Sequence, residues 1–238
     1  MNNANNNEYD DNGELIFEGK YLNGKRNGKG KEYNDNGKLK FEGEYLNGLR
    51  NGKGREYFDN DILIFEGEYL NDKKWEGKGY DIFNNIIYEL KEGKGIIKEY
   101  NERRHLLFEG EYLNGKRNRK GKEYNHRGEL IFEGEYLNGK RNGKGKQYNY
   151  WNGKLEFEGE YLNGLRNGKG KEYDEGTLIF EGEYLNGQRN GKEYFKGKLY
   201  FEGEYLNGQR NGKGKEYDDN SNLEFEGEYL NGQKNYWK

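Results

Sequence analysis

The tripeptide Phe-Glu-Gly recurs along almost the whole chain. Its copies begin at Phe17, Phe41, Phe65, Phe108, Phe132, Phe157, Phe180, Phe201 and Phe225. Successive copies lie 21 to 25 residues apart, except for a gap of 43 residues after Phe65 that contains a damaged copy at Tyr88. A period of this length is typical of repeat architectures, in which each copy buries its apolar surface against its neighbours. The chain is therefore predicted to be one array of about ten copies.

The best preserved copy reads FEGEYLNGKRNGKGKQYNYWNGKLE and begins at Phe132. Phe132, Gly134 and Tyr136 alternate with charged residues, and this period of two predicts a β-strand. A loop is expected over 138–143 and a second, short strand over 144–148.

Asn-Gly pairs punctuate the copies. The pair Asn152-Gly153 precedes the next copy, and Asn-Gly is the strongest short signal for a type I′ hairpin turn because both residues tolerate positive φ. No helical periodicity is present. The fold class is therefore predicted to be all-β, an elongated single-layer antiparallel meander of about ten tandem β-hairpins.

Glycines lie within these predicted strands, where they cost conformational entropy and pack nothing. Gly134, Gly143 and Gly145 make sense if aromatic rings lie flat over the bare backbone, as in aromatic rescue of strand glycines. One face is thus predicted to carry an aromatic–glycine ladder, used for stacking or for binding, with Leu22 and Tyr33 on the other face. The ladder comprises Phe17, Tyr21, Phe41, Tyr45, Phe65, Tyr69, Phe108, Tyr112, Phe132, Tyr136, Phe157, Tyr161, Phe180, Tyr184, Phe201, Tyr205, Phe225 and Tyr229.

The copies are not uniform along the chain. Residues 1–7 are Asn-rich and expected to be disordered, and residues 8–238 form the array. Deletions make the copies at 71–107 and 187–198 irregular, and the ribbon is not expected to be straight there.

Composition narrows the function classes. Hydrophobic residues make up 30% of the chain and charged residues 36%, so a thick core cannot form. Cysteine is absent and no apolar run is long enough to span a bilayer. The expected location is the cytoplasm, free or in association with a membrane or the cytoskeleton.

The segment FEGEYLNGKRNGKG resembles the MORN motif, whose pattern is aromatic-x-Gly-x-aromatic-x-x-Gly-x-x-x-Gly-x-Gly. The segment GKGKEYNDNGKL, at 28–39, is similar to the MORN variant of bacterial antitoxin-like repeat proteins. The resemblance covers residues 8–236, although Tyr stands where the motif often has Trp and Arg119 replaces a glycine. It implies a scaffold associated with membrane-proximal or cytoskeletal assemblies.

The residues needed for catalysis are scarce. The chain has one serine (Ser221), one threonine (Thr177) and two histidines (His105 and His126), the latter both in predicted turns. Ser221 lies several repeats from either histidine, too far along a ribbon for a catalytic triad. We therefore predict a protein that is not an enzyme, with no catalytic residues, no metal site and no cofactor.

Charge placement is the remaining functional signal. The predicted longer loops are basic, and in a regular meander they project from one edge. This basic edge is a candidate binding surface made of Lys25, Arg26, Lys29, Lys31, Arg50, Lys53, Lys116, Arg117, Lys140, Arg141, Arg166, Arg189 and Arg210.

Three functional hypotheses remain. The first is a scaffold or adaptor that binds an extended or helical segment of a protein partner, with self-association into a homodimer through the open sheet ends. The second is attachment of the basic edge to acidic phospholipid. The third is an antitoxin- or immunity-like role, which rests on the resemblance. Nucleic acid is not expected as a partner because the net charge is −3.

Overall fold

The computed structural model describes residues 4–58, 62–101 and 103–236. These residues form 21 β-strands and no helix, which confirms the all-β prediction. They divide into two compact units, residues up to 117 and residues from 118 onward.

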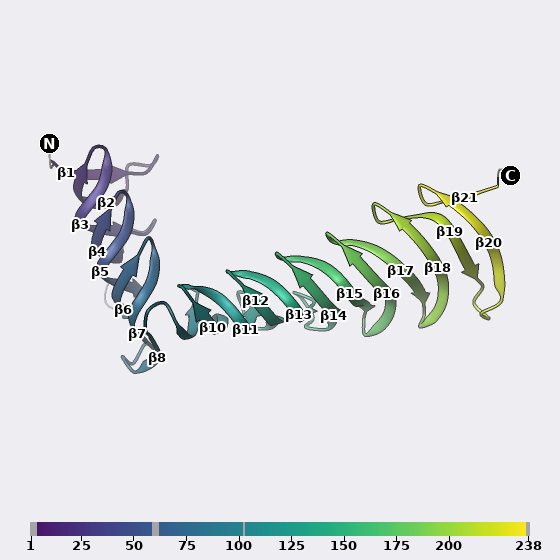
Figure 1. Ribbon diagram of the computed structural model, residues 1–238. Coiled ribbons are helices and arrows are strands. Elements are labelled where there is room, and N and C mark those ends of the chain that lie inside the picture. Colours follow the sequence, from purple (N-terminus) through teal and green to yellow (C-terminus); the bar gives the residue numbers. More distant parts are fainter. Residues whose placement is uncertain (1–3, 59–61, 102, 237–238) are drawn as a thin grey trace. The chain divides into compact units, whose positions relative to one another are not determined.

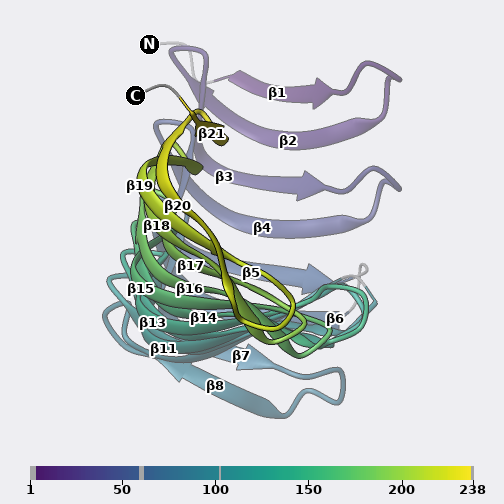
Figure 2. The same ribbon diagram turned by 90° about the vertical axis from the view of Figure 1, so that its right-hand side faces the viewer.

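The strands form two sheets, and within each sheet every strand pairs with its neighbours in the chain, as expected for a meander (Figure 1). The first sheet contains β1 (Ala4–Tyr9), β2 (Leu15–Leu22), β3 (Lys25–Tyr33), β4 (Leu39–Leu46), β5 (Leu49–Phe58), β6 (Ile62–Leu70), β7 (Lys73–Tyr80) and β8 (Ile86–Leu90). Its turns lie along two opposite edges (Figure 2).

The second sheet runs from β9 to β21 in chain order. Its strands are β9 (Gly95–Tyr100), β10 (Leu106–Leu113), β11 (Lys116–Tyr124), β12 (Leu130–Leu137), β13 (Lys140–Tyr148), β14 (Leu155–Leu162), β15 (Leu165–Asp174), β16 (Thr177–Leu185), β17 (Gln188–Phe195), β18 (Lys198–Leu206), β19 (Gln209–Tyr217), β20 (Leu223–Leu230) and β21 (Gln233–Asn235).

The hairpin turns differ from the prediction. The loop expected over 138–143 is only the two-residue turn Asn138-Gly139, whose φ values of 52° and 88° suit a type I′ turn. At 152–153, where that turn was expected, only Gly153 has positive φ. There the Asn149 side chain accepts the Trp151 N–H at 2.9 Å and so builds a longer turn.

A β-bulge explains why the second strand looked like a loop. Between the pairs Gly43–Gly54 and Tyr45–Arg50, β5 contains two residues more than β4. Gly52, with a φ of +102°, lies in this bulge, and the Glu44 carboxylate accepts the Lys53 N–H at 3.1 Å. Glycines and polar residues in the bulge therefore resemble a loop in the sequence although they belong to a strand.

The two irregular copies behave differently. The copy at 187–198 keeps the sheet continuous, and β16 pairs with β17 without a register shift because the deletion removes the bulge. In the copy at 71–107 the meander is interrupted between β8 and β9, which are joined by the tight bridge Lys91–Lys94. The missing residues shorten this hairpin so much that Gly115 lies against the Lys73 side chain.

The aromatic–glycine ladder is confirmed as the core. The phenylalanines at the centre of most copies have no exposed surface, as for Phe17 and Phe132. A Cβ atom on Gly30 would lie 2.4 Å from Cζ of Phe17, so only glycine leaves room for the ring. Tyr33 lies on the opposite face, as predicted, where its hydroxyl donates to Glu18.

The two ends of the array are paired or covered in part. Residues 4–7, expected in a disordered tail, belong to β1 and pair with β2; residues 1–3 lie outside the described residues. At the other end, the Tyr236 ring packs against Phe225 at a centroid distance of 5.9 Å. It takes the place that the tyrosine of a following copy takes elsewhere, as Tyr229 does on Phe201.

Candidate partner-binding surfaces

The aromatic face is stabilised from above by arginines. The Arg26 guanidinium lies 4.0 Å from the centre of the Phe17 ring, a cation–π contact. The same contact recurs in other copies, from Arg50, Arg117, Arg141, Arg166, Arg189 and Arg210. Each phenylalanine beneath one of these arginines is thus enclosed by glycine backbone below and guanidinium above, so its ring is not available to a partner.

Glutamates join neighbouring copies on this face. Glu32 accepts hydrogen bonds from Tyr45, at 2.7 Å, and from Arg50, both of the next copy. The Phe17 ring also meets Tyr45 edge-on at 5.2 Å. The aromatic side chains therefore stack between copies, as predicted, and the charged groups form a second set of links across the same boundary.

The predicted basic edge is wrong in its placement. Its residues lie in strands rather than in loops, and they divide between the two faces of the sheet. The arginines bend over the aromatic face and pair with glutamates, whereas Lys29, Lys31 and Lys53 lie on the opposite face. Lys25, Lys116 and Lys140 are exposed at the first position after the hairpin turns.

The ion pairs lower the pKa of several glutamates. Burial by itself would raise the pKa of Glu216, but hydrogen bonds from the Lys234 ammonium, at 2.6 Å, and from two tyrosines lower it to about 2. The pKa values of other linking carboxylates are also lowered, those of Glu8, Glu32, Glu56 and Glu193.

Acidification is expected to destabilise the array. Because the folded-state pKa of Glu216 is below its ordinary value of 4.5, its contribution is complete above about pH 5 and is lost as the pH falls towards 2. The loss from this group is about 2–3 kcal/mol. Urea unfolding at pH 6 and pH 3 measures it, and Glu216→Gln should show a smaller difference between the two pH values than the wild type. An equal difference in both proteins would show that Glu216 has no such role.

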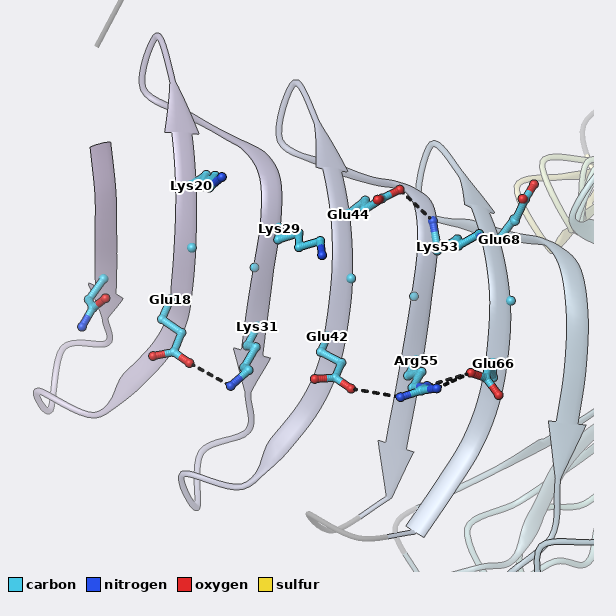
Figure 3. A pocket seen from close by; sticks show the side chains of 16 residues that line it. Glu18, Lys20, Lys29, Lys31, Glu42, Glu44, Lys53, Arg55, Glu66 and Glu68 are labelled. Atoms are coloured by element: carbon cyan, nitrogen blue, oxygen red, sulfur yellow. Dashed lines mark hydrogen bonds and ion pairs between the residues drawn. The ribbon is translucent and has the colours of Figure 1, made fainter. Parts of the chain in front are cut away.

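The face opposite the aromatics carries two rows of charged side chains (Figure 3). One row alternates in sign from strand to strand: Glu18, Lys31, Glu42, Arg55 and Glu66. Its members form ion pairs of 3.4 Å between Lys31 and Glu18 and 2.7 Å between Arg55 and Glu66. The second row comprises Lys20, Lys29, Glu44, Lys53 and Glu68. We call the two rows and their equivalents in later copies the charged face.

The charged face is a shallow, open depression. Over β2 to β6 the two rows border a volume of about 870 Å³ with glycines between them. An equivalent depression of about 660 Å³ lies over β17 to β20, with Lys213 and Glu228 on its border. The surface is therefore repeated in both units of the chain.

The interrupted copy forms a different kind of site. A groove of about 630 Å³ lies between β5–β8 on one side and β9–β10 on the other, within the first unit. Its lining includes Phe58, Ile62, Phe83, Ile97 and Tyr100, and Phe83 is 78% exposed. We call it the interrupted-copy groove.

The structure gives no sign of a catalytic or metal site in the residues that it describes. Ser221 and Thr177 are exposed, and Ser221 lies in the turn that its N–H closes onto Asp218. His126 contacts Tyr150 in a neighbouring turn. Among the described residues, no group of acidic or histidine side chains is arranged to hold a metal ion. Nor do they include a helix long and apolar enough to cross a membrane.

Comparison with protein families agrees with the repeat geometry. The model of the MORN repeat matches residues 41–61, 108–128, 132–154, 157–177, 180–192 and 201–222. The model of the MORN repeat variant matches residues 26–47. The chain belongs to the MORN repeat family. MORN repeats are in general non-catalytic modules for interaction with proteins or membranes. A comparison with curated proteins found no match for this MORN array.

The sequence contained a signal for the interrupted-copy groove that the repeat pattern obscured. Ile96 and Ile97 stand where the first MORN copy has Lys29 and Gly30. Ile97 is buried and lines the groove, and Ile96 beside it is 64% exposed. Apolar residues at positions that are charged or glycine in other copies thus indicated a surface that is more apolar than the charged face.

Proposed function

We propose that this MORN array is a non-catalytic scaffold that binds a protein partner along its charged face. The observation that carries the proposal is that the charged groups on the two faces of the sheet differ in their role. The arginines and linking glutamates of the aromatic face hold the copies together, while the charged face presents an ordered pattern of exposed lysine and glutamate.

The sign pattern favours a polypeptide over a lipid surface. An anionic membrane gains about 1 kcal/mol per adjacent lysine or arginine. On the charged face, however, Lys31 and Arg55 have glutamates within ion-pair distance. Alternating charges at a fixed strand spacing can be matched by a polypeptide that places its own charges in register, which confers specificity.

A capture experiment tests the proposal. The intact protein and a variant with Lys53, Lys144 and Lys213 all changed to Glu are used to capture partners from extracts of the producing cells. These lysines occupy equivalent exposed positions on the charged face. A protein bound by this face should be recovered with the intact array. Its recovery with the variant should be at least tenfold lower.

The matched control has the same change of net charge at the hairpin turns. Lys25, Lys116 and Lys140 are changed to Glu, and captured proteins should be unaffected. Equal loss with both variants would contradict binding to the charged face. Co-sedimentation with phosphatidylserine vesicles at low salt tests the membrane alternative, and an immunity-like partner would be recovered in the same capture.

A further inference from the structure

The interruption of the meander leaves two strand edges beside each other. β8 is the last strand of the first sheet and β9 is the outermost strand of the second. They are joined at Lys91 and Lys94, which exchange two backbone hydrogen bonds of 2.9 Å. Beyond this bridge the described residues show no ladder between the two strands. Each strand therefore presents backbone groups along one side, which can pair with an added strand.

The interrupted-copy groove lies along these edges. Tyr88 of β8 and Ile97 of β9 are buried at its floor. Its mouth is formed by exposed apolar side chains, with Ile82, Phe83 and Tyr100 exposed by 42%, 78% and 46%. An extended segment entering here would find hydrogen-bonding groups and an apolar surface together, the two requirements for strand addition.

Most of the groove charges that lack an ion-pair partner among the described residues are basic: Lys73, Lys98 and Arg104, against Asp72 and Asp81. The carboxylates of Glu56 and Glu99 form ion pairs of 2.7 Å with basic residues of the aromatic face. By contrast, Lys73, Lys98 and Arg104 form no ion pair with a described carboxylate, although Glu109 lies opposite Lys98 in the ladder between β9 and β10.

The acidic side chains at the mouth are engaged by backbone groups. Asp72 accepts the Arg50 N–H at 2.7 Å, and Asp81 accepts the Phe83 N–H at 2.9 Å. The Arg104 guanidinium lies 5.5 Å from the Phe58 ring and faces the groove with its charge uncompensated by any described carboxylate. A segment with acidic side chains would complement this surface.

We propose that the interrupted-copy groove binds an extended segment of a partner protein that alternates apolar and acidic residues, and that this segment pairs with the open edge of β9. Backbone hydrogen bonds supply affinity, apolar side chains enter the groove, and acidic side chains meet Lys98 and Arg104. The site does not overlap the two depressions of the charged face, over β2 to β6 and over β17 to β20, so the proposed scaffold would hold partners at more than one place.

The probe is a fluorescent peptide with the sequence LEFEGEYL, identical to residues 155–162, because it alternates apolar and acidic side chains. Titration into the full-length protein, followed by anisotropy, should show saturable binding. Hydrogen exchange should slow at the backbone amides of Gly95–Tyr100. The same peptide with alternate backbone nitrogens methylated cannot add as a strand and should bind at least tenfold more weakly. Equal binding of both peptides, or unchanged exchange in β9, would overturn the proposal.

Charge reversal tests the basic groove. The double variant Lys98→Glu, Arg104→Glu should bind the acidic peptide at least tenfold more weakly, and a peptide with lysines in place of its glutamates should regain that loss. The double variant Lys144→Glu, Lys213→Glu, on the charged face, makes the same change of net charge; it is the matched control and should bind as the wild type does. Thermal unfolding of each variant verifies folding. Unchanged binding by the double variant would also overturn the proposal. Neither result affects the capture experiment, whose variants leave the groove intact.

Discussion

Replacing Phe132 by alanine is expected to lower the free energy of unfolding by about 3–5 kcal/mol. The ring has no exposed surface and meets Tyr136 and Tyr161 edge-on at 5.6 and 5.3 Å. It is enclosed by the Arg141 guanidinium, 4.0 Å from the ring centre, and by the backbone of Gly145. The truncation would therefore open a cavity that touches two copies at once. Urea unfolding followed by circular dichroism measures the change.

Two companion variants make the result specific to the ladder. Leu137→Ala removes a side chain that is 48% exposed and should alter the free energy of unfolding by no more than about 0.5 kcal/mol. Gly145→Ala tests the same contact from the other side, because its Cβ would lie 2.5 Å from Cζ of Phe132. It should destabilise the sheet clearly more than Leu137→Ala. If Phe132→Ala costs no more than Leu137→Ala, the ladder is not the core.

Glu172→Ala is expected to lower the free energy of unfolding by about 2–3 kcal/mol, because a buried carboxylate that accepts charge-assisted hydrogen bonds is lost. Glu172 is only 7% exposed and accepts hydrogen bonds from Tyr184, at 2.9 Å, and from Arg166, at 2.6 Å. It also pairs with Arg189 of the following copy. Its removal would leave two guanidinium groups on the aromatic face without their shared carboxylate. Urea unfolding at neutral pH measures the loss.

The control for this change is Glu183→Ala in the adjacent strand. Glu183 is exposed and lies opposite Asn190 in β17, so its removal should change the free energy of unfolding by no more than about 0.5 kcal/mol. Glu172→Gln keeps a hydrogen-bond acceptor for Tyr184 but not the charge, and should fall between the two. Similar losses for Glu172→Ala and Glu183→Ala would refute the linking role of Glu172.

The fold was predictable because its determinants are local and repeated. The spacing of Phe132, Gly134 and Tyr136 predicts a strand and one aromatic face, and the structure confirms both. The position of the arginine side chains on the aromatic face was not predictable in this way. Asn142 and Gly143 have the composition of a loop but lie within β13, whose bulge the sequence does not reveal. The resulting error placed Arg141 at an edge instead of over Phe132.

The interrupted-copy groove was beyond prediction for another reason. Its lining joins residues far apart in the chain, such as Phe58 and Arg104, and their proximity depends on how the shortened hairpin interrupts the sheet. The sequence did predict irregularity at 71–107. It could not show that the irregularity opens a surface, because that outcome depends on the direction in which β8 and β9 separate.

The links between copies have a mechanical consequence. Glu32 joins its own copy only to the next one, through Tyr45 and Arg50, and strands contact chiefly their neighbours in the sheet. No element reaches across several copies among these contacts. Under tension applied at its two ends, such a sheet is expected to open one hairpin after another. The hairpins that have not yet opened keep their contacts while they bear the tension. The array can therefore lengthen in small steps while its remaining surface stays available to whatever is bound there.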